Sequence, residues 1–106
     1  MLPKSHRLPH SVRLTRAQSL RTDLFVVKSA LNNLGTSRFG VVISKKVDKR
    51  AVGRNRMRRL INQAILTHFL PTSRGQDTLF IVQKPFVQLP EQLLEEVVIF
   101  LKKASL

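Results

Sequence analysis

The chain has 106 residues, 42% of them hydrophobic, which suits one folded domain over residues 1–106 with a single core. Nineteen Lys and Arg residues against six Asp and Glu residues give a formal net charge of +13. Such an excess indicates a polyanionic partner, most often a nucleic acid. The absence of cysteine excludes disulfides and thiolate metal sites, and no apolar run reaches the roughly 20 residues of a membrane span.

The N-terminal segment, residues 1–22, is polar and basic and contains two prolines. It lacks the apolar stretch of a signal peptide, so we expect a cytoplasmic protein with no membrane partner. Its first ten or so residues are expected to be irregular. The loose apolar spacing of residues 11–21 predicts a short helix with Ser11 as its N-cap.

Three strands are predicted from β-branched and apolar runs, over residues 23–30, 38–47 and 76–84. Asn and Gly in residues 32–37 tolerate left-handed backbone angles and therefore predict a turn. The first two strands, joined by this turn, predict an antiparallel hairpin or meander.

Two helices follow from apolar residues spaced at the helical period. One is predicted over residues 54–70, ended by Pro71, and the other over residues 91–103. The later helix has acids in its first half and lysines at its end, which matches the helix dipole. Together the elements predict an α+β fold with helices packed on one face of the sheet. The expected core residues of the two helices are Met57, Leu60, Ile61, Ala64, Ile65 and His68, and then Leu94, Val97, Val98 and Leu101.

Six cations crowd into residues 49–60, at the entrance of the first predicted helix. Free N–H groups and the dipole make a helix N-terminus prefer anions, so arginine there is unfavourable unless phosphates bind. Guanidinium forks suit bidentate phosphate contacts, and the crowding disfavours the alternative of a merely solvated charged face. Asn55 is either the helix N-cap or an RNA contact. Gly53 lies where the chain turns into the helix, which indicates a role in backbone geometry.

No catalytic constellation is visible in the sequence. The three histidines are scattered, and Asp48 and Asp77 are isolated acids for which a structural role is favoured over metal binding. We therefore predict no catalytic side chain, no metal site and no cofactor bound by the protein itself.

The segment RFGVVISKKVDKRAVGRNRMRRLI, residues 38–61, resembles the bacterial ribonuclease P protein component family. That family shows an apolar strand, an SKKV exit, a short basic loop and an RNR helix start followed by basic residues. The later DTLFIVQK strand and the closing helix resemble the family's next elements, so the likeness covers residues 23–103. RNR alone would be a weak match, whereas RNR joined to RFG and SKK at this spacing is a specific one.

The resemblance implies the small basic partner of a catalytic RNA that removes the 5′ leader from precursor tRNA. The RNA, with its bound magnesium ions, would carry out the chemistry, and no obligate protein partner is expected. The implied fold is an α-β sandwich, with a central mixed sheet of about four strands and a left-handed βαβ crossover, a rare hand. The implied RNA-binding residues are Lys45, Lys46, Lys49, Arg50, Arg54, Asn55, Arg56, Arg58 and Arg59.

The chain departs from the family pattern in its aromatic residues. Family members usually carry an N-terminal helix with Phe residues that help bind the single-stranded leader, whereas residues 1–22 contain no Phe, Tyr or Trp. Phe25, on the first predicted strand, is then the leader-binding candidate, and Phe39 and Phe80 are predicted to be core residues. The main alternative function is a small basic ribosomal protein that binds ribosomal RNA. A DNA-binding helix-turn-helix is disfavoured, because strands precede the basic helix.

Overall fold

The computed structural model describes residues 2–9, 14 and 16–105. A mixed sheet in the order β1-β2-β4-β3 forms its centre. β2 pairs antiparallel with both β1 and β4, while β3 pairs parallel with β4. The strands are β1 (Gln18–Arg21), β2 (Phe25–Leu31), β3 (Arg38–Val42) and β4 (Gln76–Val82).

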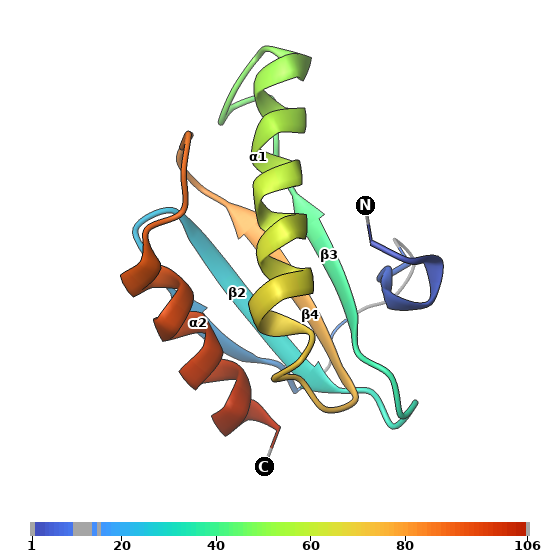
Figure 1. The fold of residues 1–106 in the computed structure, drawn as a ribbon. Helices are drawn as coiled ribbons and strands as arrows, with labels where there is room; N and C mark the ends of the chain where they lie inside the picture. The colour runs from blue at the N-terminus through green and yellow to red at the C-terminus, as the bar shows by residue number, and fades with distance from the viewer. Residues whose placement is uncertain (1, 10–13, 15, 106) are drawn as a thin grey trace.

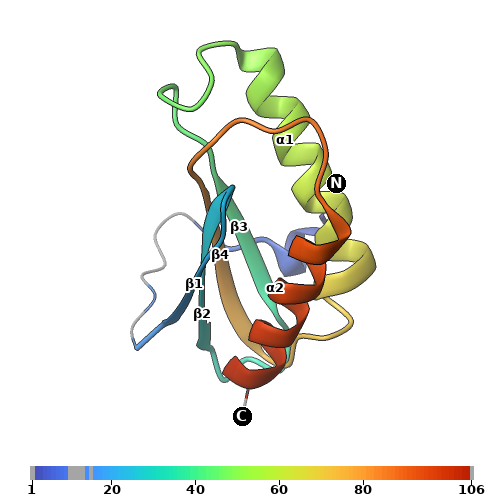
Figure 2. The ribbon, with the colours of Figure 1, turned by 90° about the vertical axis from the view of Figure 1, so that its left-hand side faces the viewer.

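Two helices cover one face of this sheet and lie beside each other (Figures 1 and 2). They are α1 (Ala51–Ala64), which continues into a π-helical turn, η2 (Ile65–Phe69), and α2 (Glu91–Ala104). In Figure 1, β3 and β4 both run upward, α1 descends in front of them, and β4 lies to the left of β3. This arrangement is a left-handed crossover. The predicted α-β sandwich with a mixed sheet of four strands is therefore confirmed.

The predicted hairpin between the first two apolar strands is wrong, because β4 lies between β2 and β3. The turn chemistry itself is present, since Asn33 and Gly35 have positive φ angles of 60° and 75°. However, β4 is the most continuously buried strand and takes the central place, where it pairs on both sides. Strand β3 is also shorter than predicted, and the chain leaves the sheet after Val42.

The helix predicted over residues 11–21 is also wrong in the part that the structure describes. Residues 18–21 form β1, which pairs along β2, and Arg16 has a positive φ of 56° that no helix allows. Tertiary pairing with the free edge of β2 overrides a weak local helical pattern. The proposed N-cap, Ser11, lies outside the described residues.

Aromatic rings from three elements meet between the sheet and the helices. The ring of Phe80 packs edge-on against Phe25 and stacks on Phe69, with centroid distances of 5.4 Å in both pairs. Phe39 and Phe80 are buried, as predicted. His68, by contrast, was predicted to be buried and is exposed. The π-turn, closed by Leu70 N donating to Ile65 O at 2.7 Å, widens the helical period and directs Phe69 inward in place of His68.

The remaining predicted helix core is confirmed in its main positions. Met57, Ile61, Ala64 and Ile65 are buried, as are Val97 and Leu101 in α2, whereas Leu60, Leu94 and Val98 are only half-buried. In α2 the buried stripe also includes Leu93 and Ala104, so it is rotated slightly from the predicted one.

Residues 2–9 run along the outer edge of β3. Leu2 is buried in the core, and Leu8 N donates to Phe39 O at 2.9 Å. Leu8 then packs beside Gly40, where an added Cβ would lie 3.4 Å from Leu8 Cβ. Residues 2–9 are largely irregular, as predicted, apart from a short 3-10 turn, η1 (Lys4–His6), but they are anchored to the sheet.

A partly buried ion pair joins the starts of β3 and β4. Arg38 donates from Nε to Asp77 Oδ1 at 2.8 Å and from a terminal nitrogen to Oδ2 at 2.7 Å, while Asn32 Nδ2 donates to Oδ1 at 2.9 Å. Burial raises the pKa of Asp77, but the hydrogen bonds from Arg38 and Asn32 and the charge of Arg38 lower it further, so this pKa lies below its usual value. These contacts give Asp77 the structural role that the sequence predicted.

Acidification is expected to destabilise the fold through Asp77. The pKa of Asp77 is lowered on folding. The ionised carboxylate therefore stabilises the fold fully above the unfolded-state pKa of about 3.9, and this stabilisation is lost as pH falls through the folded-state pKa. Asp77→Asn should cost about 1–3 kcal/mol at neutral pH and should flatten the acid dependence. Urea denaturation between neutral and acidic pH measures both effects, with the exposed Asp23→Asn as control. An unchanged acid dependence in Asp77→Asn would contradict this assignment.

Candidate nucleic-acid interface

The loop between β3 and α1 carries the first part of the predicted RNA-binding cluster. Ile43 is buried and Val47 packs against the core, so these two apolar side chains anchor the loop. Val47 N donates to Ser44 O at 3.1 Å, which closes a turn. Lys45 and Lys46 lie on this turn between the anchors and are exposed.

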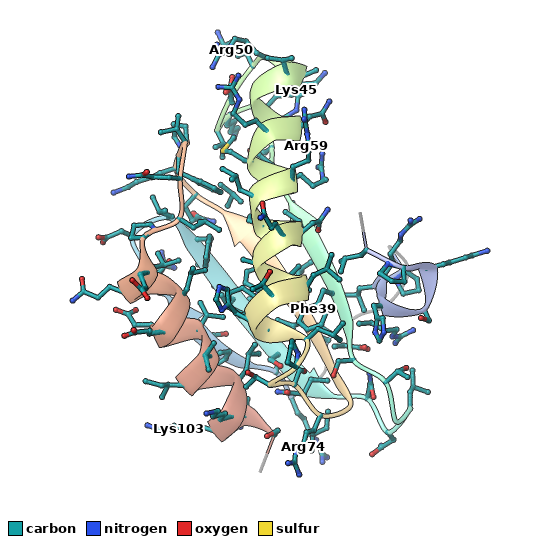
Figure 3. The ribbon with its side chains drawn as sticks, viewed as in Figure 1. Phe39, Lys45, Arg50, Arg59, Arg74 and Lys103 are labelled. Carbon is teal, nitrogen blue, oxygen red and sulfur yellow. The ribbon has the colours of Figure 1, made fainter. Side chains whose placement is uncertain are left out.

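The first turns of α1 carry the rest of the cluster, and the loop and these turns lie at one end of the molecule (Figure 3). Figure 3 labels Lys45 and Arg50 at this end and Arg59 further down the helix, with Arg74 and Lys103 at the opposite end. Arg54 and Arg58 are half-buried, whereas the other predicted RNA-binding side chains are exposed. We call residues 45–59 the basic surface.

The start of α1 has no side-chain cap. The helix begins at Ala51, three residues before the predicted start at residue 54, with Arg50 as the N-cap residue. No side chain caps it, and its first turn contains no acid. Asn55 is therefore not the N-cap; it lies inside the helix, exposed, and accepts a long hydrogen bond from Arg58 at 3.5 Å. Uncapped N–H groups surrounded by guanidinium groups are suited to a phosphate.

Gly53 was predicted to shape the backbone before the helix, and this prediction is wrong. It lies within the first turn of α1 and is not among the glycines with positive φ, which are Gly35 and Gly75. Its role is steric instead, because a Cβ at this position would overlap the carboxylate of Asp48. Asp48 in turn pairs with Arg50 at 3.3 Å, so this acid is a structural one, as predicted.

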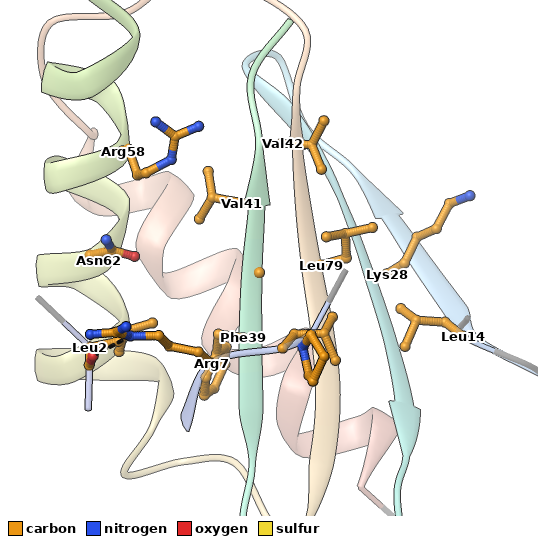
Figure 4. A pocket seen from close by; sticks show the side chains of 13 residues that line it. Leu2, Arg7, Leu14, Lys28, Phe39, Val41, Val42, Arg58, Asn62 and Leu79 are labelled. Atoms are coloured by element: carbon orange, nitrogen blue, oxygen red, sulfur yellow. Dashed lines mark hydrogen bonds between the residues drawn. The ribbon is translucent and has the colours of Figure 1, made fainter. Parts of the chain in front are cut away.

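A groove of about 630 Å³ runs along the β3 edge, next to the basic surface (Figure 4). Arg58 and Asn62 of α1 line it on the side of β3 that faces the helices, while Lys28 and Leu79 line it on the open side of the sheet. Arg7 contributes from the N-terminal segment and donates from Nε to Leu2 O at 2.8 Å. Sequence analysis missed Arg7, Lys28 and Asn62. Lys28 could have been noticed in the sequence, because it is the one charged residue inside the apolar run of β2.

Phe25 does not line this groove, and its predicted leader-binding role is wrong. The ring is only 1% exposed and packs against Phe80 under the helices. Side chains alternate along a strand, and Phe25 shares its face with the buried Val27 and Ser29. Phe39 lines the groove but is itself only 2% exposed. Neither ring offers a free face to a base.

The described residues contain neither a metal-binding cluster nor a membrane-spanning helix. Within residues 2–9, 14 and 16–105, no group of three or more acidic or histidine side chains could hold a metal ion. In the same part of the chain, no helix combines the length and the apolar character needed to cross a membrane.

The fold and the basic surface together define a small α-β sandwich protein of the class that binds polyanions. The family model for ribonuclease P matches residues 2–105. The chain therefore belongs to the ribonuclease P protein family, whose members take part in tRNA processing. It is a protein component of a ribonuclease, and the alternative of a ribosomal protein is not supported.

Individual relatives agree with this family assignment. A ribonuclease P protein component from Synechococcus sp. is 37% identical, in an alignment that covers all of this chain and 97% of that protein. The one from Marinomonas sp. is 43% identical, over 50% of this chain and 39% of that protein. The fold is similar to that of the ribonuclease P protein from Thermotoga maritima, with a TM-score of 0.68 and 24% identity over 83% of this chain and 84% of that one.

Proposed function

We propose that the basic surface binds the catalytic RNA of ribonuclease P, and that this RNA removes the 5′ leader from precursor tRNA. The observation that carries the proposal is the uncapped start of α1, surrounded by exposed cations. N–H groups at a helix start and nearby guanidinium groups act on the same anion, so phosphates of an RNA backbone suit this end of the molecule.

Charge balance supports the same conclusion. Among the described cations of residues 45–59, Arg50 alone forms an ion pair with a carboxylate, that of Asp48. The other cations repel one another in the free protein. Binding a polyanion would relieve this repulsion and release the counterions condensed on the RNA. Such contacts position a protein on the backbone without reading the base sequence.

In this proposal the RNA supplies the chemistry, and magnesium ions reach the reaction through the RNA. The protein contributes charge and position, with no catalytic side chain, no cofactor of its own and no obligate protein partner. Precursor tRNA would lie near the groove at the β3 edge, where Arg7, Lys28 and Arg58 supply positive charge. A cytoplasmic location, where precursor tRNA would be processed, belongs to the same proposal.

A cleavage assay with precursor tRNA tests the proposal. At low magnesium, the protein together with its cognate RNA subunit is expected to cleave faster than the RNA alone, because the basic surface offsets phosphate repulsion. The protein without RNA should not cleave. The control is a folded variant with Arg54, Arg56, Arg58 and Arg59 changed to Gln, which should stimulate weakly. Cleavage by RNA-free protein that a single side-chain change abolishes, or no stimulation at all, would contradict the proposal.

A further inference from the structure

We propose that Asp48 is a positioning residue for the basic surface, and that residue 53 is glycine to make room for its carboxylate. Asp48 would hold Arg50, and the turn into α1, in the geometry that receives RNA phosphate. This inference rests on the proposed binding of RNA by residues 45–59. It assigns a binding role to an acid within a cluster of cations.

The carboxylate of Asp48 binds both the backbone N–H and the guanidinium group of Arg50. Asp48 Oδ1 accepts from Arg50 N at 2.9 Å and from Arg50 Nε at 3.3 Å, and Oδ2 accepts from a terminal guanidinium nitrogen at 3.3 Å. The Asp48 side chain is only 13% exposed although it belongs to a surface loop, whereas that of Arg50 is 74% exposed. The half-buried acid therefore directs an otherwise free guanidinium group.

The main chain at Asp48 is held as well, by a second arginine. Arg54 donates from one terminal nitrogen to Asp48 O at 2.9 Å and to Lys49 O at 3.0 Å. Arg54 lies in the first turns of α1, so these bonds join the helix to the two residues before its cap. Asp48 thus links two arginines of the basic surface, one through its side chain and one through its main chain.

Gly53 provides the independent observation. An added Cβ at residue 53 would lie 2.7 Å from Asp48 Cγ and still closer to Oδ2, which is nearer than real Cβ atoms come. The backbone does not require glycine, because Gly53 is an ordinary helical residue, and alanine is the better helix former. The close approach of the Asp48 carboxylate is what explains a glycine at this position.

Fixing Arg50 in advance would favour binding, because an ordered side chain loses less conformational entropy when it meets its partner. A guanidinium group carries five N–H donors. Asp48 engages Nε and one terminal nitrogen, so the remaining donors stay available to phosphate. Simple electrostatics makes the opposite prediction, since removing an acid from this surface raises its positive charge. The two accounts therefore differ in sign.

The test compares four variants for binding to the cognate catalytic RNA at one fixed salt concentration. Asp48→Ala is expected to weaken binding about tenfold, the loss of one well-placed charged contact. Asp23→Ala raises the charge equally, at an exposed site outside the basic surface, and should bind as tightly as the wild type or slightly tighter. Gly53→Ala, which leaves the charge unchanged, should weaken binding to a similar degree as Asp48→Ala.

The double variant decides between coupled and separate effects. Alanine at residue 53 is expected to be harmful only through its overlap with the Asp48 carboxylate. The double variant Asp48→Ala/Gly53→Ala should therefore bind RNA no more weakly than Asp48→Ala, and it should melt at a higher temperature than Asp48→Ala. Tighter binding by Asp48→Ala, or two independent losses that add, would overturn the proposal. If Asp48→Ala does not fold, Asp48→Asn replaces it. Asp48→Asn keeps the acceptor for Arg50 N, so intermediate binding supports the proposal and tighter binding overturns it.

Failure of the proposed RNA binding can be distinguished from failure of the Asp48–Gly53 inference. A wild-type protein that does not bind catalytic RNA would contradict RNA binding by the basic surface. The thermal stabilities would still report on the Asp48–Gly53 contact. Gly53→Ala should lower the melting temperature when Asp48 is present and raise it when residue 48 is alanine. The same direction of change in both backgrounds would overturn the steric assignment of Gly53.

Discussion

Raising the salt concentration from about 50 to about 200 mM is expected to weaken binding of the catalytic RNA by about 250- to 1,000-fold. The reason is the number of cations in the basic surface without an internal carboxylate partner. If about six of them meet phosphates, log K should fall with log salt at a slope of about −4 to −5. Fluorescence anisotropy of labelled RNA over a salt series measures this slope.

Single substitutions divide the slope among residues. Arg56 and Arg59 are exposed, so Arg56→Gln and Arg59→Gln should leave the fold intact and should each reduce the slope by about 0.7–0.9. The matched controls are Lys102→Gln and Lys103→Gln, exposed cations at the end of α2, which should leave it unchanged. A wild-type slope near about −1 would show that most of the cluster does not meet phosphate.

Replacing Phe25 by alanine is expected to remove much of the stability of the fold. The ring is buried between the sheet and the helices and packs edge-on against Phe80. Truncating a buried phenylalanine costs about 3–5 kcal/mol. That is a large part of the roughly 5–15 kcal/mol that stabilises a typical domain. Urea denaturation followed by circular dichroism measures the loss.

Phe25→Leu separates a core role from a base-binding role. Leucine keeps most of the buried apolar volume and should cost less than about 1.5 kcal/mol. Because the ring does not face the groove, Phe25→Leu should leave the affinity ratio of precursor to mature tRNA unchanged. Because the described residues that line the groove offer no free aromatic face, that ratio should be small and should vary little with leader sequence. A folded Phe25→Leu protein that loses its leader preference would show that the ring reaches RNA.

Elements with a strong local period were predicted well. The alternating and continuous apolar runs of β2 and β4, and the helical spacing of α1 and α2, depend on neighbours along the chain, so sequence alone locates them. The cations of residues 45–59 are close together in sequence and lie in the loop before α1 and in its first turns. Their position at one end of the molecule therefore follows once α1 is placed. The motif at residues 38–61 led to the correct family.

Pairing and burial partners were predicted poorly, because distant residues decide them. Residues 18–21 become a strand only because β2 has a free edge to pair with. The π-turn after α1 places Phe69 in the core in place of His68, because Phe69 packs against Phe80 of the sheet. Phe25 was assigned to the wrong face of β2. The alternation of side chains along a strand separates its two faces but does not show which face the helices cover.

The sequence by itself determined a basic α+β protein, its principal strands and helices, and the cation-rich start of α1, because composition and periodicity are properties of neighbouring residues. Only the tertiary structure decided that β4 inserts between β2 and β3, that residues 2–9 run along the β3 edge, and that Asp48 lies against Gly53. Each of these depends on which surfaces exclude water together and which atoms meet without overlap. Such contacts join residues that no local pattern connects.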